Sequence, residues 1–257
     1  MSMDHYQGAA AIVTGGASGL GAAVARALSQ RGIQVCVFDV NEALGASVAK
    51  EIGGCYALVD IADPSSVEAG IAYAEGKQGN TRILVNCAGI GGASKTVTRG
   101  QAHDASLFER IIKVNLMGCF HVASQVAAKM IPLPSLDDDA SRGVIINTSS
   151  VAAFEGQVGQ LAYAASKGGI ASMTIPMARD LADKGIRVCT IAPGLFQTPL
   201  MDDLPDEVQA SLGAQVPFPS RLGQADEFAN LACHVIDNTM LNGEVIRLDG
   251  ALRMGPR

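Results

Sequence analysis

Short apolar runs alternate with longer stretches of helical periodicity along the whole chain. Seven runs rich in β-branched residues predict strands, at residues 9–15, 33–39, 55–60, 82–89, 143–150, 186–194 and 244–250. Stretches with apolar residues every three or four positions predict helices between them, for example at residues 19–31, 42–51, 64–76, 105–131 and 159–184. Apolar strands separated by helices form a parallel sheet covered on both sides. Because crossovers between parallel strands are right-handed, we expect an α/β fold with a doubly wound sheet.

Nothing in the pattern divides the 257 residues into two domains, since no linker, repeat or change of composition interrupts it. We therefore expect one Rossmann-type domain over residues 1–257, with about seven parallel strands and helices on both faces. Residues 132–142, with their two prolines and three adjacent aspartates, predict a surface loop. Residues 193–223 follow the sixth strand and are rich in proline, which predicts a lid over the carboxyl ends of the strands.

Composition and charge narrow the classes of partner. The formal net charge is −6 and no run of Lys or Arg is present, which argues against nucleic acid or an anionic membrane. No uninterrupted apolar run has the length of a membrane span. The His and Cys residues form no cluster with metal-ligand spacing, so we expect no metal site. The first residues resemble neither a secretory signal nor a transit peptide, so we expect a cytoplasmic protein.

A glycine-rich turn, VTGGASGLG at residues 13–21, joins the first predicted strand to the first predicted helix. Gly15, Gly19 and Gly21 let a pyrophosphate approach the backbone at the helix N-terminus, where its charge is stabilised. A tight strand–helix turn without a ligand is the alternative. The stretch NCAG after the fourth strand offers a second small-residue approach to a flat ligand, through Asn86, Cys87, Ala88 and Gly89.

Asp39 strengthens the prediction of a dinucleotide site. It ends the second strand, where a carboxylate accepts hydrogen bonds from the adenosine ribose hydroxyls. A 2′-phosphate would meet like-charge repulsion there, and Gly16, Ala17 and Val40 supply no cation, so we expect NAD rather than NADP. As an alternative, Asp39 caps the following helix. Asp60, after the third strand, either faces the adenine or begins the turn DIADP.

Tyr163 and Lys167, in YAASKGG, are one helical turn apart, so their side chains share a face. Free tyrosine has a pKa of about 10, too high for a base at neutral pH. A neighbouring ammonium and the positive nicotinamide of an oxidised cofactor stabilise a phenolate. With a Ser hydroxyl from TSS, residues 148–150, on the substrate oxygen, such a pair can remove the proton of an alcohol whose hydride passes to nicotinamide. Alternatively, Tyr163 packs in a helix interface and Lys167 is solvated.

Together these motifs resemble the short-chain dehydrogenase/reductase family over essentially the whole chain. The matching stretches are TGGASGLG, NCAG, KVNLMG, INTSS, YAASK and IAPGLFQTP, with Asp39 after the second strand. A closer similarity is to the family's 3-hydroxyacyl-CoA dehydrogenases, which also act on hydroxysteroids, through GVIINT, SVAAFEGQVGQ, IAPGLF, QVPFPSRLG and NGEVIRLDGA. The resemblance implies an NAD-dependent enzyme of fatty acid metabolism that interconverts 3-hydroxyacyl-CoA and 3-oxoacyl-CoA.

The resemblance also implies roles for single residues. Ser150 would be the catalytic serine and Tyr163 the acid/base. Lys167 would bind the nicotinamide ribose, and Asn115 would hold a water that links Lys167 to solvent. For Asn115, a local backbone bond within its helix is the alternative. Besides the glycines, the implied cofactor contacts are Ser18, Leu20, Asp39, Asp60, Ile61, Cys87, Tyr163, Lys167, Phe196 and Thr198. The alternatives are lid packing for Phe196 and a turn cap for Thr198.

Substrate and assembly also follow from the resemblance. Relatives carry a Lys-rich, CoA-associated insertion after the fourth strand, whereas residues 91–104 here are slightly shorter and hold only Lys95 and Arg99. These two are the candidate CoA contacts, unless they are simply solvated. The family pairs subunits through the helices at 105–131 and 159–184, so we expect a homodimer or homotetramer, with intrachain packing as the alternative. Other interpretations are a hydroxysteroid or other secondary-alcohol dehydrogenase and, in a different class, a non-catalytic NAD-binding scaffold.

Overall fold

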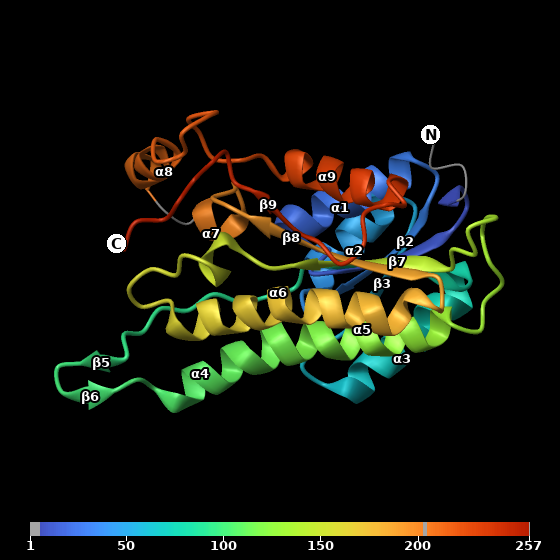
Figure 1. Cartoon of the computed structure of the whole chain (residues 1–257), viewed down its shortest axis with the longest axis horizontal. Coiled ribbons are helices and arrows are strands. Elements are labelled where there is room, and N and C mark those ends of the chain that lie inside the picture. The colour runs from blue at the N-terminus through green and yellow to red at the C-terminus, as the bar shows by residue number, and fades with distance from the viewer. Residues whose placement is uncertain (1–5, 203–204, 257) are drawn as a thin grey trace.

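The computed structural model describes residues 6–202 and 205–256, and a seven-stranded sheet forms its centre (Figure 1). Neighbouring strands run parallel, in the order β3-β2-β1-β4-β7-β8-β9. The strands are β1 (Ala10–Thr14), β2 (Gln34–Asp39), β3 (Cys55–Leu58), β4 (Thr81–Asn86), β7 (Gly143–Thr148), β8 (Ile186–Pro193) and β9 (Val245–Leu248). The doubly wound parallel sheet that the sequence predicts is confirmed.

Helices cover both faces of this sheet. They are α1 (Gly19–Gln30), α2 (Glu42–Glu51), α3 (Pro64–Gln78), α4 (Ala105–Ile111), α5 (Gly118–Met130), α6 (Leu161–Ala182), α7 (Pro199–Asp202), α8 (Asp206–Gly213) and α9 (Ala225–Asp237). In Figure 1, α1 and α9 lie on one side of the sheet, and α3, α5 and α6 lie on the other. A π-helical turn, Ile112–Met117, joins α4 to α5 without a break.

Alternation of side chains along the strands explains the two covered faces. Ile12 and Leu84 belong to the apolar cluster on the α3–α5–α6 side, whereas their neighbours Val13 and Val85 belong to the cluster on the α1–α9 side. All four are fully buried. Each such side chain contributes about 1.5–3 kcal/mol on burial, so both faces need helices to cover them.

The strand order places the ligand-binding edge of the sheet. The chain leaves β1 toward β2 on one side, and it returns on the other side of β1 as β4. Helices then diverge from the carboxyl ends of β1 and β4, and a crevice opens between them. The glycine-rich turn 13–21, Asp39 and the NCAG stretch (86–89) all lie at this edge, because each follows a strand that ends there.

The connecting segments add detail that periodicity does not predict. Within residues 91–104, a short antiparallel hairpin of β5 (Val97–Thr98) and β6 (Gln101–Ala102) extends beyond α4 (Figure 1). The predicted lid contains the two short helices α7 and α8, and its residues 203–204 lie outside the described part of the chain. Residues 132–142 form the expected loop.

Among the described residues, the continuous helix Ala105–Met130 has the length and mean hydropathy that a membrane span requires. Its apolar residues Val122, Val126 and Met130 are fully buried in the cluster between this helix and the sheet. Core helices of soluble folds carry the same composition, so packing on the sheet accounts for the apolarity of this helix.

Candidate active site

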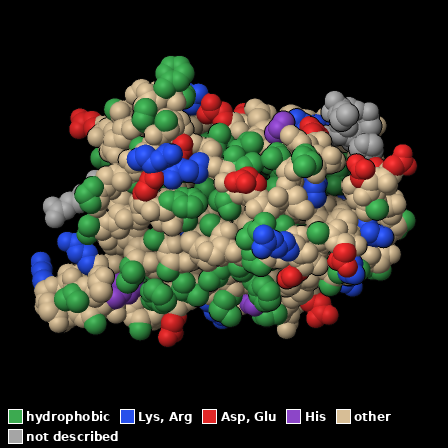
Figure 2. All heavy atoms as spheres, viewed as in Figure 1, with side chains coloured by type: hydrophobic (Ala, Val, Ile, Leu, Met, Phe, Trp, Pro, Cys, Tyr) green, Lys and Arg blue, Asp and Glu red, His purple; other side chains and the backbone are tan. Residues whose placement is uncertain are grey.

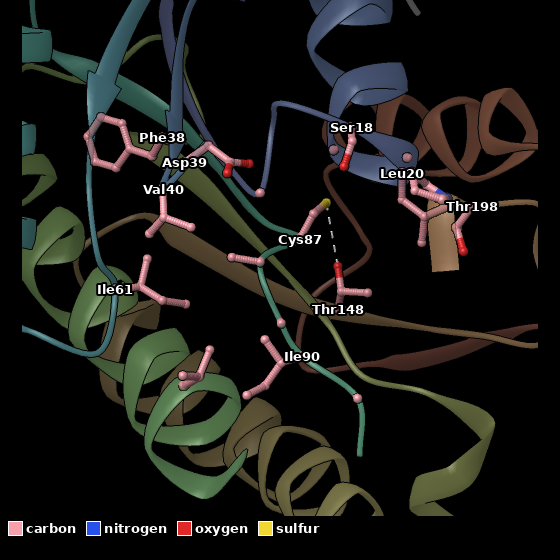
Figure 3. Close-up of a pocket in the computed structure, with 18 of the residues that line it drawn as sticks. Ser18, Leu20, Phe38, Asp39, Val40, Ile61, Cys87, Ile90, Thr148 and Thr198 are labelled. Carbon is pink, nitrogen blue, oxygen red and sulfur yellow. Dashed lines mark hydrogen bonds between the residues drawn. The ribbon is translucent and has the colours of Figure 1, made fainter. Parts of the chain in front are cut away.

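A cleft of about 630 Å³ opens at the carboxyl ends of the strands (Figure 3). Its walls come from the β1–α1 turn, the ends of β2, β3, β4 and β7, helix α6 and the start of the lid. In Figure 3, Ser18, Leu20 and Thr198 stand on one side, Val40 and Ile61 on the other, and Cys87 and Thr148 between them. This position matches the binding crevice of doubly wound sheets.

The glycine-rich turn brings backbone against the cleft floor. Gly15 has a φ of 65°, and a Cβ there would lie 2.7 Å from the backbone of Ala88. A Cβ on Gly21 would collide with the carbonyl oxygen of Gly15. The turn can therefore fold this tightly only with glycine at both positions.

Helix α1 begins at this turn with free polar groups. Ser18 is the residue before its first turn, and the Ser18 side chain makes no capping hydrogen bond. The N–H groups of the first turn of a helix lack partners within the helix, so they and the Ser18 hydroxyl can bind an anion in the cleft. Leu20 lines the same wall.

Asp39 joins the end of β2 to the glycine-rich turn. Its Oδ2 accepts a hydrogen bond from the Ala17 N–H at 3.1 Å, and its Oδ1 accepts one from the Asn41 N–H at 2.9 Å. The alternative that Asp39 caps the next helix is wrong, because the Asn41 side chain caps α2 by accepting from the Leu44 N–H. The Asp39 carboxylate lines the cleft instead.

Asp60 fits both interpretations of its role. Its Oδ1 accepts a hydrogen bond from the Ala62 N–H at 2.9 Å, which forms the turn after β3, while the residue also lines the cleft. Asp63, not Asp60, caps α3. Ile61 lines the cleft as well, and it packs so closely on Gly118 that a Cβ at Gly118 would lie 2.7 Å from it.

The first residue of the NCAG stretch lies in the core, and the other three line the cleft. The buried Asn86 side chain accepts a hydrogen bond from the Thr14 hydroxyl at 3.3 Å and donates one to Asn147 Oδ1 at 3.0 Å. The side chain therefore ties together β1, β4 and β7. Cys87 lines the cleft beside Thr148, with Ala88 and Gly89. Burial raises the pKa of the Cys87 thiol to about 11, so it is a neutral contact surface rather than a nucleophile.

Tyr163 and Lys167 both reach the cleft from one face of α6. Lys167 is only 4% exposed, so the alternative of a solvated lysine is wrong. Its Nζ donates a hydrogen bond to the Thr148 carbonyl oxygen at 2.8 Å and lies 5.8 Å from the centre of the Tyr163 ring. The end of β7 thus fixes an ammonium beside a phenol in the cleft.

The two serines after β7 have different surroundings. The Ser149 hydroxyl donates to the Lys167 carbonyl oxygen at 2.7 Å, which ties β7 to α6. Ser150 begins a 3₁₀ turn, Val151–Ala153, and its Oγ accepts from the Ala152 N–H at 3.1 Å. Ser149 is among the described residues that line the cleft, whereas the predicted catalytic Ser150 is not among them and is 8% exposed.

Asn115 sits in the π-helical turn, a distortion that is frequent at functional sites. Its side chain bonds both backbone groups of Ile90, at 2.8 and 3.0 Å, and donates to the Ser166 hydroxyl at 3.0 Å. These partners are 25 and 51 positions away, so the alternative of a local backbone bond is wrong. A Cβ at Gly89 would lie 3.2 Å from Asn115 Oδ1 and 3.5 Å from Lys167 Nζ, which places both side chains against the same glycine.

The two predicted cofactor contacts in the lid, Thr198 and Phe196, lie in different surroundings. Thr198 lines the cleft and packs with Pro199 on Gly19, so the lid begins by crossing the glycine-rich turn. Phe196 is buried and meets Phe228 edge to face, with ring centres 6.5 Å apart. The structure thus places Phe196 in the packing beneath the lid, outside the main cleft.

The predicted CoA contacts lie apart from the cleft. Lys95 and Arg99 are exposed in the hairpin segment, Arg99 at the turn between β5 and β6, and neither lines the cleft. Arg110 of α4 lines it instead, together with Val114 on the next turn of the same helix. Arg110 and Val114 are one helical turn apart, and Val114 directly precedes Asn115. This spacing is the sequence signal that could have placed them in the cleft.

Other residues complete the cleft. The unpredicted lining residues are Phe38, Val40, Val59, Ile90, Gly91, Arg110, Val114, Pro193 and Pro199. Phe38, Val40, Val59 and Pro193 lie at strand ends or directly after them, so the expected sheet edge was enough to find their region but not their orientation.

Comparison with known proteins supports this interpretation. The short chain dehydrogenase family matches residues 9–209. The chain is 52% identical to the human 3-hydroxyacyl-CoA dehydrogenase type-2 and 53% identical to the Bos taurus protein of that name, each over 97% of both chains. The crystal structure of 3-hydroxyacyl-CoA dehydrogenase type-2 from Mycobacterium avium superposes with a TM-score of 0.95 at 40% identity, over 100% of both chains. The protein belongs to the short-chain dehydrogenase family of oxidoreductases.

Proposed function

We propose that this protein is an NAD-dependent dehydrogenase that interconverts 3-hydroxyacyl-CoA and 3-oxoacyl-CoA. Dehydrogenases of its family generally use NAD or NADP. The observation that carries the proposal is the buried Lys167 ammonium held 5.8 Å from the Tyr163 ring, in a cleft that also contains the glycine-rich turn. The names of the similar proteins support the substrate class.

The residues of the cleft fit a dinucleotide. The free N-terminus of α1 and the Ser18 hydroxyl would hold the pyrophosphate, and Asp39 would accept hydrogen bonds from the adenosine ribose. Asp39 favours NAD over NADP, because a 2′-phosphate would come close to its carboxylate. Thr198, Cys87 and the other predicted contacts that line the cleft keep their proposed roles in holding the cofactor, whereas Phe196 and Asn86 do not line it.

The side chains of the cleft can then move a proton. When bound, the nicotinamide ring takes up or gives back the hydride of the substrate carbon. With Tyr163 as the phenolate, its oxygen takes the proton of the substrate alcohol, while the Ser150 hydroxyl donates a hydrogen bond to the same substrate oxygen. Lys167 stabilises the negative charge of the phenolate before this transfer, and Asn115 holds α6 beside it through the Ser166 hydroxyl.

The test is a steady-state assay with purified protein. NAD and 3-hydroxybutyryl-CoA are mixed, and formation of NADH is followed by absorbance, with NADP in parallel. We expect turnover with NAD and much weaker turnover with NADP. Absence of turnover with 3-hydroxyacyl-CoA of any chain length, alongside turnover of a steroid or another alcohol, would contradict the acyl-CoA assignment.

A hydroxysteroid or other secondary-alcohol dehydrogenase is the second candidate. The exposed position of Lys95 and Arg99 outside the cleft favours it, because it removes the support that these two predicted contacts would give to CoA recognition in the cleft. This candidate predicts equal activity on substrates with and without CoA. A non-catalytic scaffold is disfavoured, since Ser150, Tyr163, Lys167 and Asn115 are all present and binding alone does not need a phenol beside the buried ammonium.

The assembly and location of the enzyme are further parts of the proposal. The continuous α4–α5 helix and α6 carry exposed apolar side chains, which support pairing of subunits into a homodimer or homotetramer. These side chains are Met117, Phe120, Leu161 and Ile175. Figure 2 shows hydrophobic side chains over this pair of helices. A role in fatty acid metabolism and a cytoplasmic location stay predictions.

A further inference from the structure

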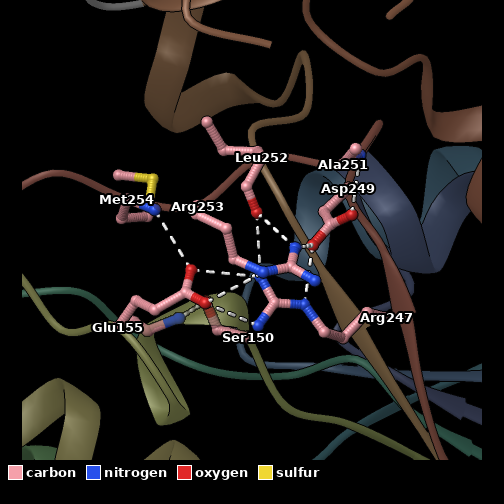
Figure 4. A network of polar contacts seen from close by, with 9 residues as sticks. Ser150, Glu155, Arg247, Asp249, Ala251, Leu252, Arg253 and Met254 are labelled. Carbon is pink, nitrogen blue, oxygen red and sulfur yellow. Dashed lines mark hydrogen bonds and ion pairs between the residues drawn. The ribbon is translucent and has the colours of Figure 1, made fainter. Parts of the chain in front are cut away.

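A network of charged groups lies next to the segment that follows the catalytic serine (Figure 4). At its centre is Arg247 of β9, whose Nη1 and Nη2 donate to the two carboxylate oxygens of Glu155 at 2.9 and 3.1 Å. Its Nε donates to Asp249 Oδ2 at 2.7 Å, and Nη2 also donates to the Leu252 carbonyl oxygen at 2.9 Å. The planar guanidinium is thus held by three partners.

The network is partly shielded from water, since the Arg253 side chain is 61% exposed, and it is balanced in charge. Side chains of Arg247 and Glu155 are 21% and 22% exposed, and that of Asp249 is 8% exposed. Arg253 adds a second cation, 3.3 Å from Glu155 and 3.1 Å from Asp249. The hydrogen bonds from Arg247 hold the pKa of Glu155 below its usual value, so the ion pair is intact at neutral pH.

Glu155 is rigidly connected to Ser150. The two residues are joined by the 3₁₀ turn, in which the Glu155 N–H donates to the Val151 carbonyl oxygen at 3.0 Å. The Ala152 N–H, in the same turn, donates to Ser150 Oγ itself. Phe154, between them, lies under Arg247, with 5.4 Å from the guanidinium carbon to the ring centre. One tight turn with these two hydrogen bonds therefore links the backbone of Glu155 to the Ser150 hydroxyl.

The C-terminal segment holds the other half of the loop between Ser150 and Tyr163. The Val158 N–H donates to the Pro256 carbonyl oxygen at 3.0 Å, and Gln157 Nε2 donates to the Gly255 carbonyl oxygen at 3.2 Å. The Met254 N–H donates to Glu155 Oε2 at 3.1 Å. Residues 154–158 are thus bound along their length to β9 and residues 249–256.

We infer that Arg247 is a positioning residue for the proposed reaction: through Glu155 and Phe154 it sets the place of the Ser150 hydroxyl opposite Tyr163. Ser150 and Tyr163 must hold one substrate oxygen between them, and among the described residues this network links the loop that joins them to β9. The inference rests on the proposed role of Ser150. It assigns a function to four charged side chains that do not touch the cleft.

The first test is the variant Arg247→Met. We expect kcat to fall about tenfold to a hundredfold, because a displacement of about 1 Å at a reacting group has an effect of that size. The dissociation constant of NAD, measured by fluorescence titration, should change by less than about twofold, because the cofactor contacts lie on other strands. Glu155→Gln should lower kcat in the same direction.

The decisive test combines Arg247→Met with Ser150→Ala. If Arg247 acts through Ser150, the double variant is no slower than Ser150→Ala alone. A merely structural role of Arg247 would make the two losses multiply, and that result overturns the inference. If Ser150→Ala itself keeps full activity, the proposed role of Ser150 fails first, so the two failures are distinguishable.

A matched control is available on the other side of the molecule. Arg26 and Glu51 form the same two-point ion pair, at 2.7 and 2.9 Å, between α1 and α2. Arg26→Met should leave kcat unchanged. Should Arg247→Met fail to fold, Arg247→Lys serves instead, since lysine keeps the charge but not the two-point contact, and it should still lower kcat. Full kcat in a folded Arg247→Lys or Arg247→Met variant overturns the inference.

Discussion

At the scale of single residues, the chain contains the same tyrosine–lysine spacing twice. Tyr73 and Lys77 of α3 repeat the arrangement of Tyr163 and Lys167, with 5.6 Å from Lys77 Nζ to the ring centre against 5.8 Å for the α6 pair. Lys77 is exposed and Lys167 is 4% exposed. Water screens the ammonium of Lys77. The ammonium of Lys167 is surrounded by protein instead of water, so its charge acts more strongly on the tyrosine beside it. Burial, not spacing, distinguishes the pair that can serve as a base.

This contrast yields a prediction for Tyr163→Phe. Loss of the hydroxyl removes the proposed proton acceptor, so kcat should fall about 10²–10⁴-fold while NAD binding persists. Steady-state kinetics and a fluorescence titration with NAD measure the two quantities. Tyr73→Phe is the matched control and should be fully active. An active Tyr163→Phe enzyme would falsify the assignment of the base.

Asp39 allows a second prediction about the cofactor. In Asp39→Ala the carboxylate that repels a 2′-phosphate is gone, and a repulsion of roughly 1–4 kcal/mol at close range is removed. The ratio of kcat/KM with NADP to that with NAD should rise about tenfold or more. The exposed Asp138 in the loop 132–142 provides the control Asp138→Ala, for which the ratio should not move. A wild type that already prefers NADP contradicts the proposal.

At the scale of elements, an ion pair between Arg221 and Glu227, which we call the clasp, lies where the lid ends and α9 begins. Arg221 donates to both carboxylate oxygens of Glu227 at 2.9 and 2.8 Å, and Glu227 also caps α9 by accepting from the Gln224 N–H. Just before it, Gly223 exchanges backbone hydrogen bonds with Leu195 and Gln197 at 2.8 Å. The two ends of the lid are thus fastened together at the point where the lid leaves β8.

The clasp has a defined dependence on pH. The bonds from Arg221 and Gln224 lower the pKa of Glu227 to about 2 from 4.5. Because the folded pKa is the lower one, the charge of Glu227 stabilises the fold above pH 4.5, and this contribution is lost as the pH falls toward 2. Glu227→Gln should therefore have a lower Tm than the wild type near neutral pH, and the difference should shrink below pH 4.5.

Thermal unfolding between pH 7 and pH 3, followed by circular dichroism, measures this difference. Glutamine preserves the helix cap, so the variant isolates the charge of the side chain. Glu207→Gln, at an exposed position of α8, is the control and should show no such change with pH. A difference in Tm that stays constant to pH 3 would show that the clasp does not contribute through its charge.

At the scale of the whole molecule, the α4–α5 helix and α6 form a surface with exposed apolar side chains. Phe120 is 48% exposed and Ile175 is 44% exposed. A stable interface buries about 1,200–2,000 Å² in total, and a self-complementary face of this kind suits a two-fold pair. The active-site helix α6 would then be held from both sides.

Two charges on this face should dissociate the subunits. We expect the wild type to have the mass of a dimer or tetramer by light scattering, and Phe120→Glu combined with Ile175→Glu to lower that mass, since burying unpaired carboxylates is strongly unfavourable. Met240→Glu, at a residue that is 91% exposed elsewhere on the chain, should leave the mass unchanged. A monomeric wild type contradicts the proposed assembly.

Much of this molecule follows from local order along the chain. Strand and helix positions come from periodicity, because each element must present apolar side chains to a core on its own repeat. The edge of the sheet that would bind the cofactor can also be predicted. All parallel strands end at the same edge, so the residues that follow them lie there. Even the shared face of Tyr163 and Lys167 needs only the helical repeat.

Contacts between distant segments supplied the rest. Burial of Lys167 depends on the end of β7, the role of Asn86 depends on β1 and β7, and the partner of Glu155 is 92 positions away in β9. Placement of Arg110 in the cleft, and of Lys95 and Arg99 outside it, depends on how α4 and the hairpin leave the sheet. Such pairings are set by packing of the whole chain, because the energy of a charge depends on what surrounds it and not on its neighbours in sequence.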